Sequence, residues 1–234
     1  AGRSVRSGRG RGSDALGPRE IARLPDAALA ELSDMLGSAE DHGVWPWQLQ
    51  VILIFLLAKS ELKDRAICLL PMLTRIWAKV RQAPVRTWSR AQSGFWDKAI
   101  QGNSALRIAL MRAVWIEAHV EQGLDVAIAL LDLEGFYDSI DLLRLFHAAL
   151  GMRYPVRLLA LSFGLYLSPR ILRWKGWIAT PIQAGKSIAT GEAAGTMMAK
   201  ALVYDMLERA HHKHPVQSDQ WVDDLSLIHI SEPT

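Results

Sequence analysis

Two short segments of the chain place carboxylates directly beside apolar runs, where strands of a sheet would begin or end. Asp132 follows the run 126–131, and Asp223 and Asp224 follow Trp221 and Val222 far downstream. Carboxylates are rarely buried without a partner, so two strand ends that carry Asp predict a shared divalent cation. Two or three carboxylates suit Mg²⁺, which keeps some waters and completes its shell with phosphate oxygens. The pattern therefore predicts metal-assisted chemistry on a phosphate-bearing substrate.

The element that must position Asp132 is the apolar run before it. Val126 to Leu131 is a continuous apolar stretch bounded by Gly123 and Gly135, a pattern typical of a strand buried on both faces. Ser139 and Asp141 stand where a following helix would start, and Asp138 is interpreted as a helix cap rather than a metal ligand.

These residues resemble two motifs of a known polymerase family. The segment 132–141, Asp-Leu-Glu-Gly-Phe-Tyr-Asp-Ser-Ile-Asp, resembles motif A of reverse transcriptases, and Trp-Val-Asp-Asp at 221–224 resembles their motif C. The likeness is strongest to the non-LTR retrotransposon and group II intron types. Trp221 departs from the Tyr or Phe that is usual before x-Asp-Asp.

The resemblance implies a two-metal nucleotidyl transfer. Asp132 and Asp223 would bridge two Mg²⁺ ions, with Mn²⁺ as a possible substitute, the carbonyl of Leu133 would complete one metal shell, and Asp224 would act as an auxiliary acid. Tyr137 would lie under the sugar of the incoming nucleotide and exclude a 2′ hydroxyl. The alternatives are an N-cap or surface turn for the aspartates and a core aromatic for Tyr137. Phe136 is the better core candidate, since the side chains of these two neighbours should point apart.

Four further residues are assigned to nucleotide binding by the same resemblance. Lys59 and Arg65 lie where the fingers of the family hold the triphosphate, although both would also suit the solvated tip of a hairpin. Gln183 and Gly185 correspond to the Pro-Gln-Gly motif B, which here carries an inserted residue on each side of the Gln. Gly185 would let the backbone approach the templating base pair.

The function predicted is an RNA-directed DNA polymerase fragment that uses an RNA template, a DNA primer and deoxynucleotides. The alternatives are a catalytically decayed remnant that only binds nucleic acid, and another palm-type polymerase such as an RNA-dependent RNA polymerase. Tyr137 argues against the second, because an enzyme that makes RNA must admit the 2′ hydroxyl. The 234 residues alone are expected to be nearly inactive.

The fold class predicted is α+β, with polymerase fingers and a palm whose antiparallel sheet packs on helices. We expect a disordered basic segment at 1–17, an N-terminal helix and fingers at 18–125, and the palm at 126–224. Residues 225–234 resemble the translation of a common sequencing adapter, so they are expected to be an artefact and are left out of the fold prediction.

Composition fits this interpretation. The chain has 50% hydrophobic residues, a net charge of +3 and a pI near 9.1, which is compatible with a polyanionic partner. The single Cys68 excludes an internal disulfide. The longest apolar run, 51–58, is shorter than the roughly 20 residues that span a bilayer. Neither a signal peptide nor an initiator Met is visible, so we expect an intracellular protein whose sequence here begins internally; the oligomeric state is not predicted.

Overall fold

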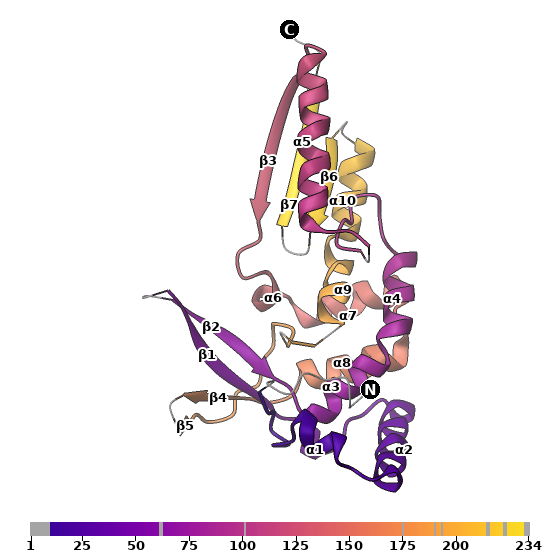
Figure 1. Ribbon diagram of the computed structural model, residues 1–234, viewed down its shortest axis with the longest axis vertical. Helices are drawn as coiled ribbons and strands as arrows, with labels where there is room; N and C mark the ends of the chain where they lie inside the picture. Colours follow the sequence, from indigo (N-terminus) through magenta and orange to yellow (C-terminus); the bar gives the residue numbers. More distant parts are fainter. Residues whose placement is uncertain are drawn as a thin grey trace.

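A computed structural model of the chain describes its fold, apart from short segments. The described residues are 10–60, 63–100, 102–174, 176–189, 191–192, 194–213, 216–221 and 224–231. Among them, no helix has the length and apolar character needed to span a membrane. Figure 1 shows an elongated molecule in which two separate sheets, each with helices beside it, lie at different levels of the long axis.

The helices and strands follow in an order without internal repeats. The helices are α1 (Pro18–Ala22), α2 (Asp26–His42), α3 (Met72–Val80), α4 (Gln82–Ala91), α5 (Ala105–Glu121), α6 (Phe136–Ser139), α7 (Leu142–Gly151), α8 (Val156–Tyr166), α9 (Gly195–Ala199) and α10 (Ala201–Lys213), with a 3₁₀ turn at Trp47–Leu49. The strands are β1 (Ile52–Ser60), β2 (Lys63–Leu69), β3 (Asp125–Asp132), β4 (Arg170–Trp174), β5 (Trp177–Ile178), β6 (Val216–Trp221) and β7 (Asp224–Ser231).

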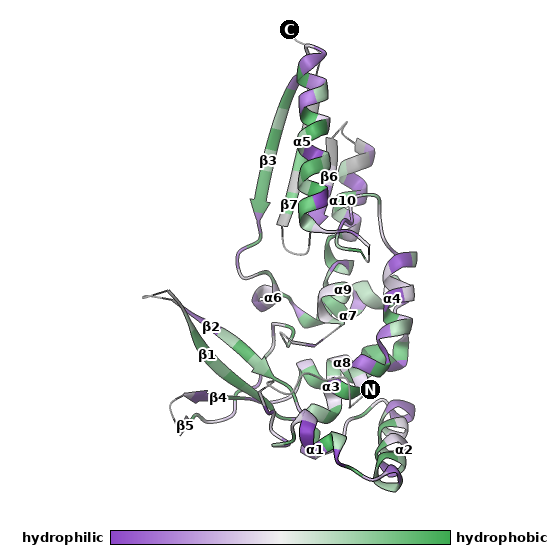
Figure 2. Ribbon diagram, in the orientation of Figure 1, coloured by the Kyte–Doolittle hydropathy of each residue, from purple (hydrophilic) through white to green (hydrophobic). Residues whose placement is uncertain are grey.

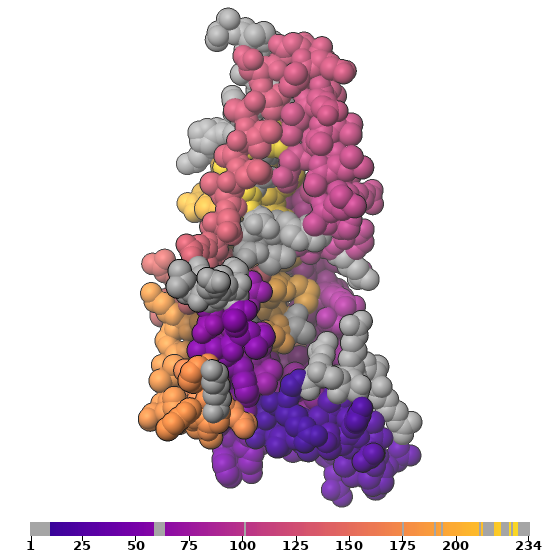
Figure 3. All heavy atoms as spheres, turned by 60° about the vertical axis from the view of Figure 1, so that its left-hand side comes forward, coloured from indigo at the N-terminus to yellow at the C-terminus, as the bar shows by residue number. Residues whose placement is uncertain are grey.

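The two sheets lie at different levels of the molecule. One is fully antiparallel with the order β3-β7-β6, and the other has the order β2-β1-β4-β5. In the second sheet β1 pairs antiparallel with β2 but parallel with β4, so this sheet is mixed. Figure 3 shows α5 and β3 in the upper part of the molecule, and the β1–β2 hairpin beside β4 and β5 in the lower part. The chain is therefore an α+β fold with antiparallel strands packed on helices, as predicted.

The main hydrophobic core surrounds α8. Most of this helix is buried, including Leu159, Leu161, Leu165 and Tyr166, and a helix that is apolar on nearly every side must lie inside. Trp45 packs against it and donates its indole N–H to the Leu161 carbonyl at 2.8 Å. The core is thus built between the two sheets rather than within either of them.

Strand β3 differs from the buried strand that its apolar sequence predicts. Ile128 is 46% exposed and Leu130 is 72% exposed, so the faces of this strand are incompletely covered by other elements. β3 is also the edge strand of its sheet and pairs only with β7 among the described residues. Helix α5 beside it also has no buried residue. Figure 2 shows apolar residues along β3 and on much of α5. The continuous apolar run therefore predicted the strand correctly, but it did not predict that its side chains would be exposed.

Residues 225–231, which were left out of the fold prediction, form most of the central strand β7. Leu225 and Ile228 are buried, and β7 pairs with β3 on one side and β6 on the other. Apolar residues that alternate along a stretch fit a strand whatever their origin. The adapter origin of this segment stays a prediction.

Residues 10–17 also differ from the disordered segment that their composition predicts; residues 1–9 lie outside the described residues. The carboxylate of Asp14 accepts hydrogen bonds from the amides of Met72 and Leu73, at the start of α3, and Ser13 donates to the Val51 carbonyl at 2.7 Å. These contacts satisfy amides that a helix start leaves without partners, and Leu16 adds an apolar contact with the cluster of Ile21, Met72 and Ile76, so the Gly-rich segment is fixed in place.

Candidate active site

The register of the antiparallel sheet brings two of the predicted site residues together. β3 ends at Asp132 and β7 begins at Asp224, and these two residues are paired directly opposite each other. Directly opposed residues of antiparallel strands have Cα atoms about 4.5–5.5 Å apart. The side chain of Asp132 is exposed. Asp223 and the side chain of Asp224 lie outside the described part of the structure.

The strand β6 that precedes motif C is held by charges that sequence reasoning missed. Asp219 is 5% exposed, and its carboxylate lies 3.3 Å from Lys98 Nζ and 3.5 Å from Arg112 Nη2. The backbone of the segment before α5 adds to this, because the Gln220 amide donates to the Trp96 carbonyl at 2.7 Å. The signal available in the sequence was Asp219 itself, because an acid in a buried strand needs cationic partners nearby.

A second buried ion pair lies next to the first. Lys200, at the junction of α9 and α10, contacts the carboxylate of Asp97 and also donates to Ser89 Oγ at 2.9 Å. Both charged side chains are less than a tenth exposed. Ser93 donates to Asp97 as well, at 3.2 Å. The pair joins α4 and the end of α9 to Asp97, which forms a β-bridge with Gln220 of β6. These contacts hold the strand that leads into the segment with the motif C resemblance.

The turn after Asp132 is formed by local hydrogen bonds. The Leu133 carbonyl accepts from the Phe136 amide at 3.0 Å, which leaves its second lone pair available to a ligand. Gly135 has φ of +60°, in the left-handed region that favours glycine, and it reverses the chain into α6.

Tyr137 and Phe136 were expected to point apart, but both are half-buried and pack against the main core. Their ring centroids are 5.2 Å apart. Neighbouring side chains point apart in a strand, because they alternate between the two faces of the sheet. The residues instead occupy a helical turn, where neighbouring side chains are only about 100° apart.

The loop with the motif B resemblance lies against the motif A segment. The Ser187 amide donates to the Ile140 carbonyl at 2.8 Å, and the Ile188 amide donates to that of Tyr137 at 3.2 Å. Arg170, which is buried, donates to the Ser187 carbonyl at 2.6 Å and holds the loop from the other side. Sequence reasoning assigned no role to Arg170.

Asp138 does not cap α7. Its carboxylate accepts from Ser187 Oγ at 3.3 Å, whereas Asp141 is the N-cap and accepts from the Arg144 amide at 2.9 Å. Asp138 lies inside α6, three residues before the cap position, so its side chain faces the motif B loop instead. This contact adds a side-chain link between the two motifs.

Gln183 and Gly185 lie on the exposed part of this loop. Gln183 donates to the Leu167 carbonyl, and a side chain built at Gly185 would meet open space. Both residues lie just before Lys186, which forms a β-bridge with Asp141, and neither has a described contact to Asp132.

A buried acid lies at the end of the same loop. Glu192 accepts from the Tyr166 hydroxyl at 2.8 Å and from the Ala194 amide at 3.1 Å. Burial raises the pKa of Glu192 above its usual 4.5, against the lowering effect of these hydrogen bonds. Burial and the nearby Glu192 carboxylate also raise the pKa of Tyr166 and of Tyr154.

The predicted nucleotide-binding cations lie on the β1–β2 hairpin. Arg65 is exposed and is paired with Leu57, and Lys59 lies near the end of β1, with its side chain outside the described part of the structure. In Figure 1 this hairpin and α6 lie on the same side of the molecule. Among the described residues, no group of three or more His, Cys, Asp or Glu is arranged to hold a metal, and that set does not include Asp223.

Comparison with known proteins yields similar solved structures but no match at the level of sequence families. No family model matches the chain, and no curated protein matches it. Among solved structures, the chain is similar to apo telomerase from Candida tropicalis truncated from its C-terminal domain, with a TM-score of 0.53 and 12% sequence identity. The similarity covers 86% of this chain and 48% of the telomerase chain, so the chain spans about half of that length. The chain therefore has a telomerase-like fold.

Proposed function

We propose that the chain is the fingers and palm of an RNA-directed DNA polymerase of the retrotransposon type, which adds deoxynucleotides to a primer. The observation that carries the proposal is the direct pairing of Asp132 with Asp224 at the ends of two strands. Like charges directly opposite each other destabilise a sheet unless something offsets them. The motif A and motif C resemblances and the telomerase-like fold support the same interpretation.

The donor set fits divalent metal. The carboxylates of Asp132, Asp223 and Asp224 and the Leu133 carbonyl are hard oxygen donors of the kind that Mg²⁺ prefers. Two bound ions would stabilise the attacking and leaving oxygens of an in-line displacement. The protein would fix these donors in two ways. The β3–β7 register sets Asp132 opposite Asp224, and the ion pairs of Asp219 with Lys98 and Arg112 hold β6 in place.

The remaining residues would bind the nucleotide. Arg65 and Lys59, on the hairpin that lies on the same side as α6, would contact the triphosphate as cations. Tyr137 would face the sugar, and the loop with Gln183 and Gly185 would approach the templating base pair. The hydrogen bonds from Ser187 and Ile188 couple this loop to the turn that carries Tyr137.

Primer extension on an RNA template with Mg²⁺ and deoxynucleotides tests the proposal. The protein is assayed both as the full reading frame of its source and as the 234-residue chain. Asp132→Asn should lower the extension rate by about a hundredfold or more, because an amide supplies no anionic charge to the metals. Asp125→Asn is the matched control, because Asp125 is an exposed acid at the other end of the same strand, and it should leave the rate near the native value.

Metal binding by the 234-residue chain gives a readout that needs no turnover. Mn²⁺ titration followed by electron paramagnetic resonance should detect binding that Asp132→Asn weakens and Asp125→Asn does not. A protein that binds the template but neither extends the primer nor binds metal would contradict the proposal. That result would support the alternative, a decayed remnant that only binds nucleic acid. Extension that prefers ribonucleotides would indicate an RNA-synthesising polymerase.

A further inference from the structure

A groove between α2 and α3 is lined by none of the residues that the proposed function assigns to polymerase chemistry. It has a volume of about 850 Å³ and is lined by apolar side chains from three helices, which are Ile21, Leu29, Leu32, Leu36, Ile76 and Val80. Leu29, Leu32 and Leu36 recur at helical spacing on α2 and are only half-buried, and Val80 of α3 is 50% exposed. Two helices thus face the same space with incompletely covered apolar stripes.

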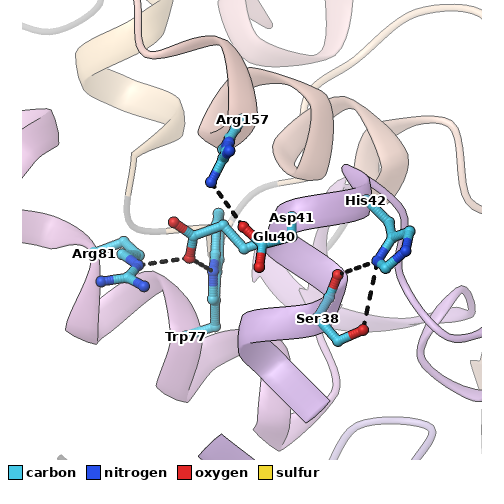
Figure 4. A network of polar contacts seen from close by, with 7 residues as sticks. All are labelled: Ser38, Glu40, Asp41, His42, Trp77, Arg81 and Arg157. Atoms are coloured by element: carbon cyan, nitrogen blue, oxygen red, sulfur yellow. Dashed lines mark hydrogen bonds and ion pairs between the residues drawn. The ribbon is translucent and has the colours of Figure 1, made fainter. Parts of the chain in front are cut away.

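Ion pairs fix the walls of this groove at one end. Arg81, just after α3, donates to Glu40 of α2 at 2.6 Å, and the indole of Trp77 donates to the same carboxylate oxygen at 3.2 Å. Arg157 of α8 donates to Asp41 at 2.7 Å. Figure 4 shows these contacts converging on the last turn of α2 from two different helices. The groove is therefore preformed, which lowers the entropy cost of filling it.

The charge of α2 selects the kind of occupant. The helix contains no Lys or Arg and carries the carboxylates Asp26, Glu31, Asp34, Glu40 and Asp41. Among the described residues, Asp26, Glu31 and Asp34 form no ion pair, and Asp34 lines the groove. This acidic helix contrasts with the chain's net charge of +3. Phosphate backbones and anionic membrane surfaces would be repelled from it.

We propose that the groove is a docking site for a basic amphipathic helix of a partner protein. A helix that lays its apolar face into a groove between two helices buries side chains at positions i, i+3, i+4 and i+7. Leucines on that face would contact Leu32, Leu36 and Val80. Lysines or arginines at its edges would lie opposite Glu31 and Asp34. The occupant would leave the polymerase site open, because α2 lies at the opposite end of the molecule from β3 (Figure 1).

A designed peptide tests the groove without knowledge of the natural partner. The probe is a fluorescein-labelled helical peptide of about 14 residues, or four turns, with leucine on one face and lysine on the other. Its binding to the full chain is followed by fluorescence anisotropy. A second peptide, with every lysine replaced by glutamate, should bind at least about tenfold more weakly, because the acidic rim repels it.

Matched variants locate the binding. Glu31→Lys with Asp34→Lys should weaken binding about tenfold, since two exposed attractions become repulsions. Glu117→Lys with Glu121→Lys makes the same charge change on the exposed surface of α5 and should leave affinity near the native value. Leu32→Ser should also weaken binding, whereas Leu106→Ser, at an 80% exposed position of α5, should not. Hydrogen exchange should show new protection in α2 and α3.

Three results would overturn the proposal. One is an equal loss of affinity in the α5 variants, which would mean nonspecific attraction. Another is unchanged affinity in both groove variants. The third is a gain in affinity when residues 1–9 are deleted, which would mean that the arginine-containing start of this same chain is the occupant instead. None of these variants alters a residue assigned to polymerase chemistry, so primer extension should be unchanged throughout.

Discussion

At the scale of single residues, the ring of Tyr137 packs against the core, and under the proposed function it would also face the sugar of the nucleotide. A mutation series can separate these two roles. We expect Tyr137→Ala to raise ribonucleotide incorporation relative to deoxynucleotide incorporation, because a smaller side chain leaves space for the 2′ hydroxyl. The ring also packs against the core and Phe136, so the variant should lose up to about 3 kcal/mol of stability, less than a fully buried aromatic would.

Single-nucleotide extension with both sugars, together with thermal melting, measures these two effects. Tyr137→Phe keeps the ring and should retain both the sugar preference and the melting temperature. An unchanged sugar preference in Tyr137→Ala, combined with a large drop in melting temperature, would show that Tyr137 is a packing residue only.

Glu192 gives the fold a predictable dependence on pH. Its pKa is raised above 4.5 by burial, so the folded chain holds a proton that the unfolded chain releases as the pH rises above that value. The free energy of unfolding contributed by this group therefore falls as the pH increases from 4.5 through the raised pKa. Glu192→Gln has no ionisable group at this position, so its free energy of unfolding should not show this fall with pH.

Urea denaturation of the native chain and of Glu192→Gln is measured across a pH series. The difference between their free energies of unfolding reports the titration of Glu192 alone. That difference should be constant below pH 4.5 and should shift in favour of Glu192→Gln above it. A difference that is independent of pH would mean that Glu192 has an ordinary pKa in the folded chain.

At the scale of elements, the position of Asp132 depends on strand β7. Leu225 and Ile228 are its buried apolar residues, and Ile228 is paired with Ile128 of β3. Leu225→Ser or Ile228→Ser should each lower the free energy of unfolding by about 2–5 kcal/mol. Leu106→Ser, at an exposed position, should change it by less than about 0.5 kcal/mol.

Hydrogen exchange gives the location of this loss. Protection should fall first in β3 and β6, because β7 lies between them, while β1 and β2 of the other sheet keep theirs. If protection of β3 survived both substitutions, its amides would not depend on pairing with β7, and the register that places Asp132 opposite Asp224 would be wrong.

At the scale of the whole molecule, the exposed apolar surface on α5 and β3 predicts self-association of the isolated chain. Leu106, Leu110 and Val114 of α5 are each more than half exposed, as is Leu130 of β3. Contiguous apolar patches of this kind mark contact surfaces or cause aggregation. Sedimentation velocity should therefore show concentration-dependent association of the native chain.

Lysine substitutions at Leu106, Leu110 and Val114 together should abolish that association, because they place charges across the patch. Leu143→Lys with Val156→Lys, at exposed apolar positions on α7 and α8, is the control and should not. A native chain that stays monomeric at all concentrations would contradict the prediction.

Several elements were predictable from local pattern. The apolar run 126–131 became most of β3, and Asp141 caps α7 where a helix start was predicted. Each depends on interactions among neighbouring residues, such as alternation, turn chemistry and helix capping, which the sequence displays directly. The α+β class was instead implied by the resemblance to reverse transcriptases, and the structure confirms it.

Tertiary structure alone decided the rest. A shared site for Asp132 and Asp224 was predicted, but the register that sets them directly opposite each other appears only in the pairing of β3 with β7. The Lys200–Asp97 contact likewise joins residues 103 positions apart. Neither is encoded in a local pattern, because any strand can pair with several others and any cation with several acids. The apolar run of β3 identified a strand, but its exposure depends on which elements cover it, and only the completed packing determines that.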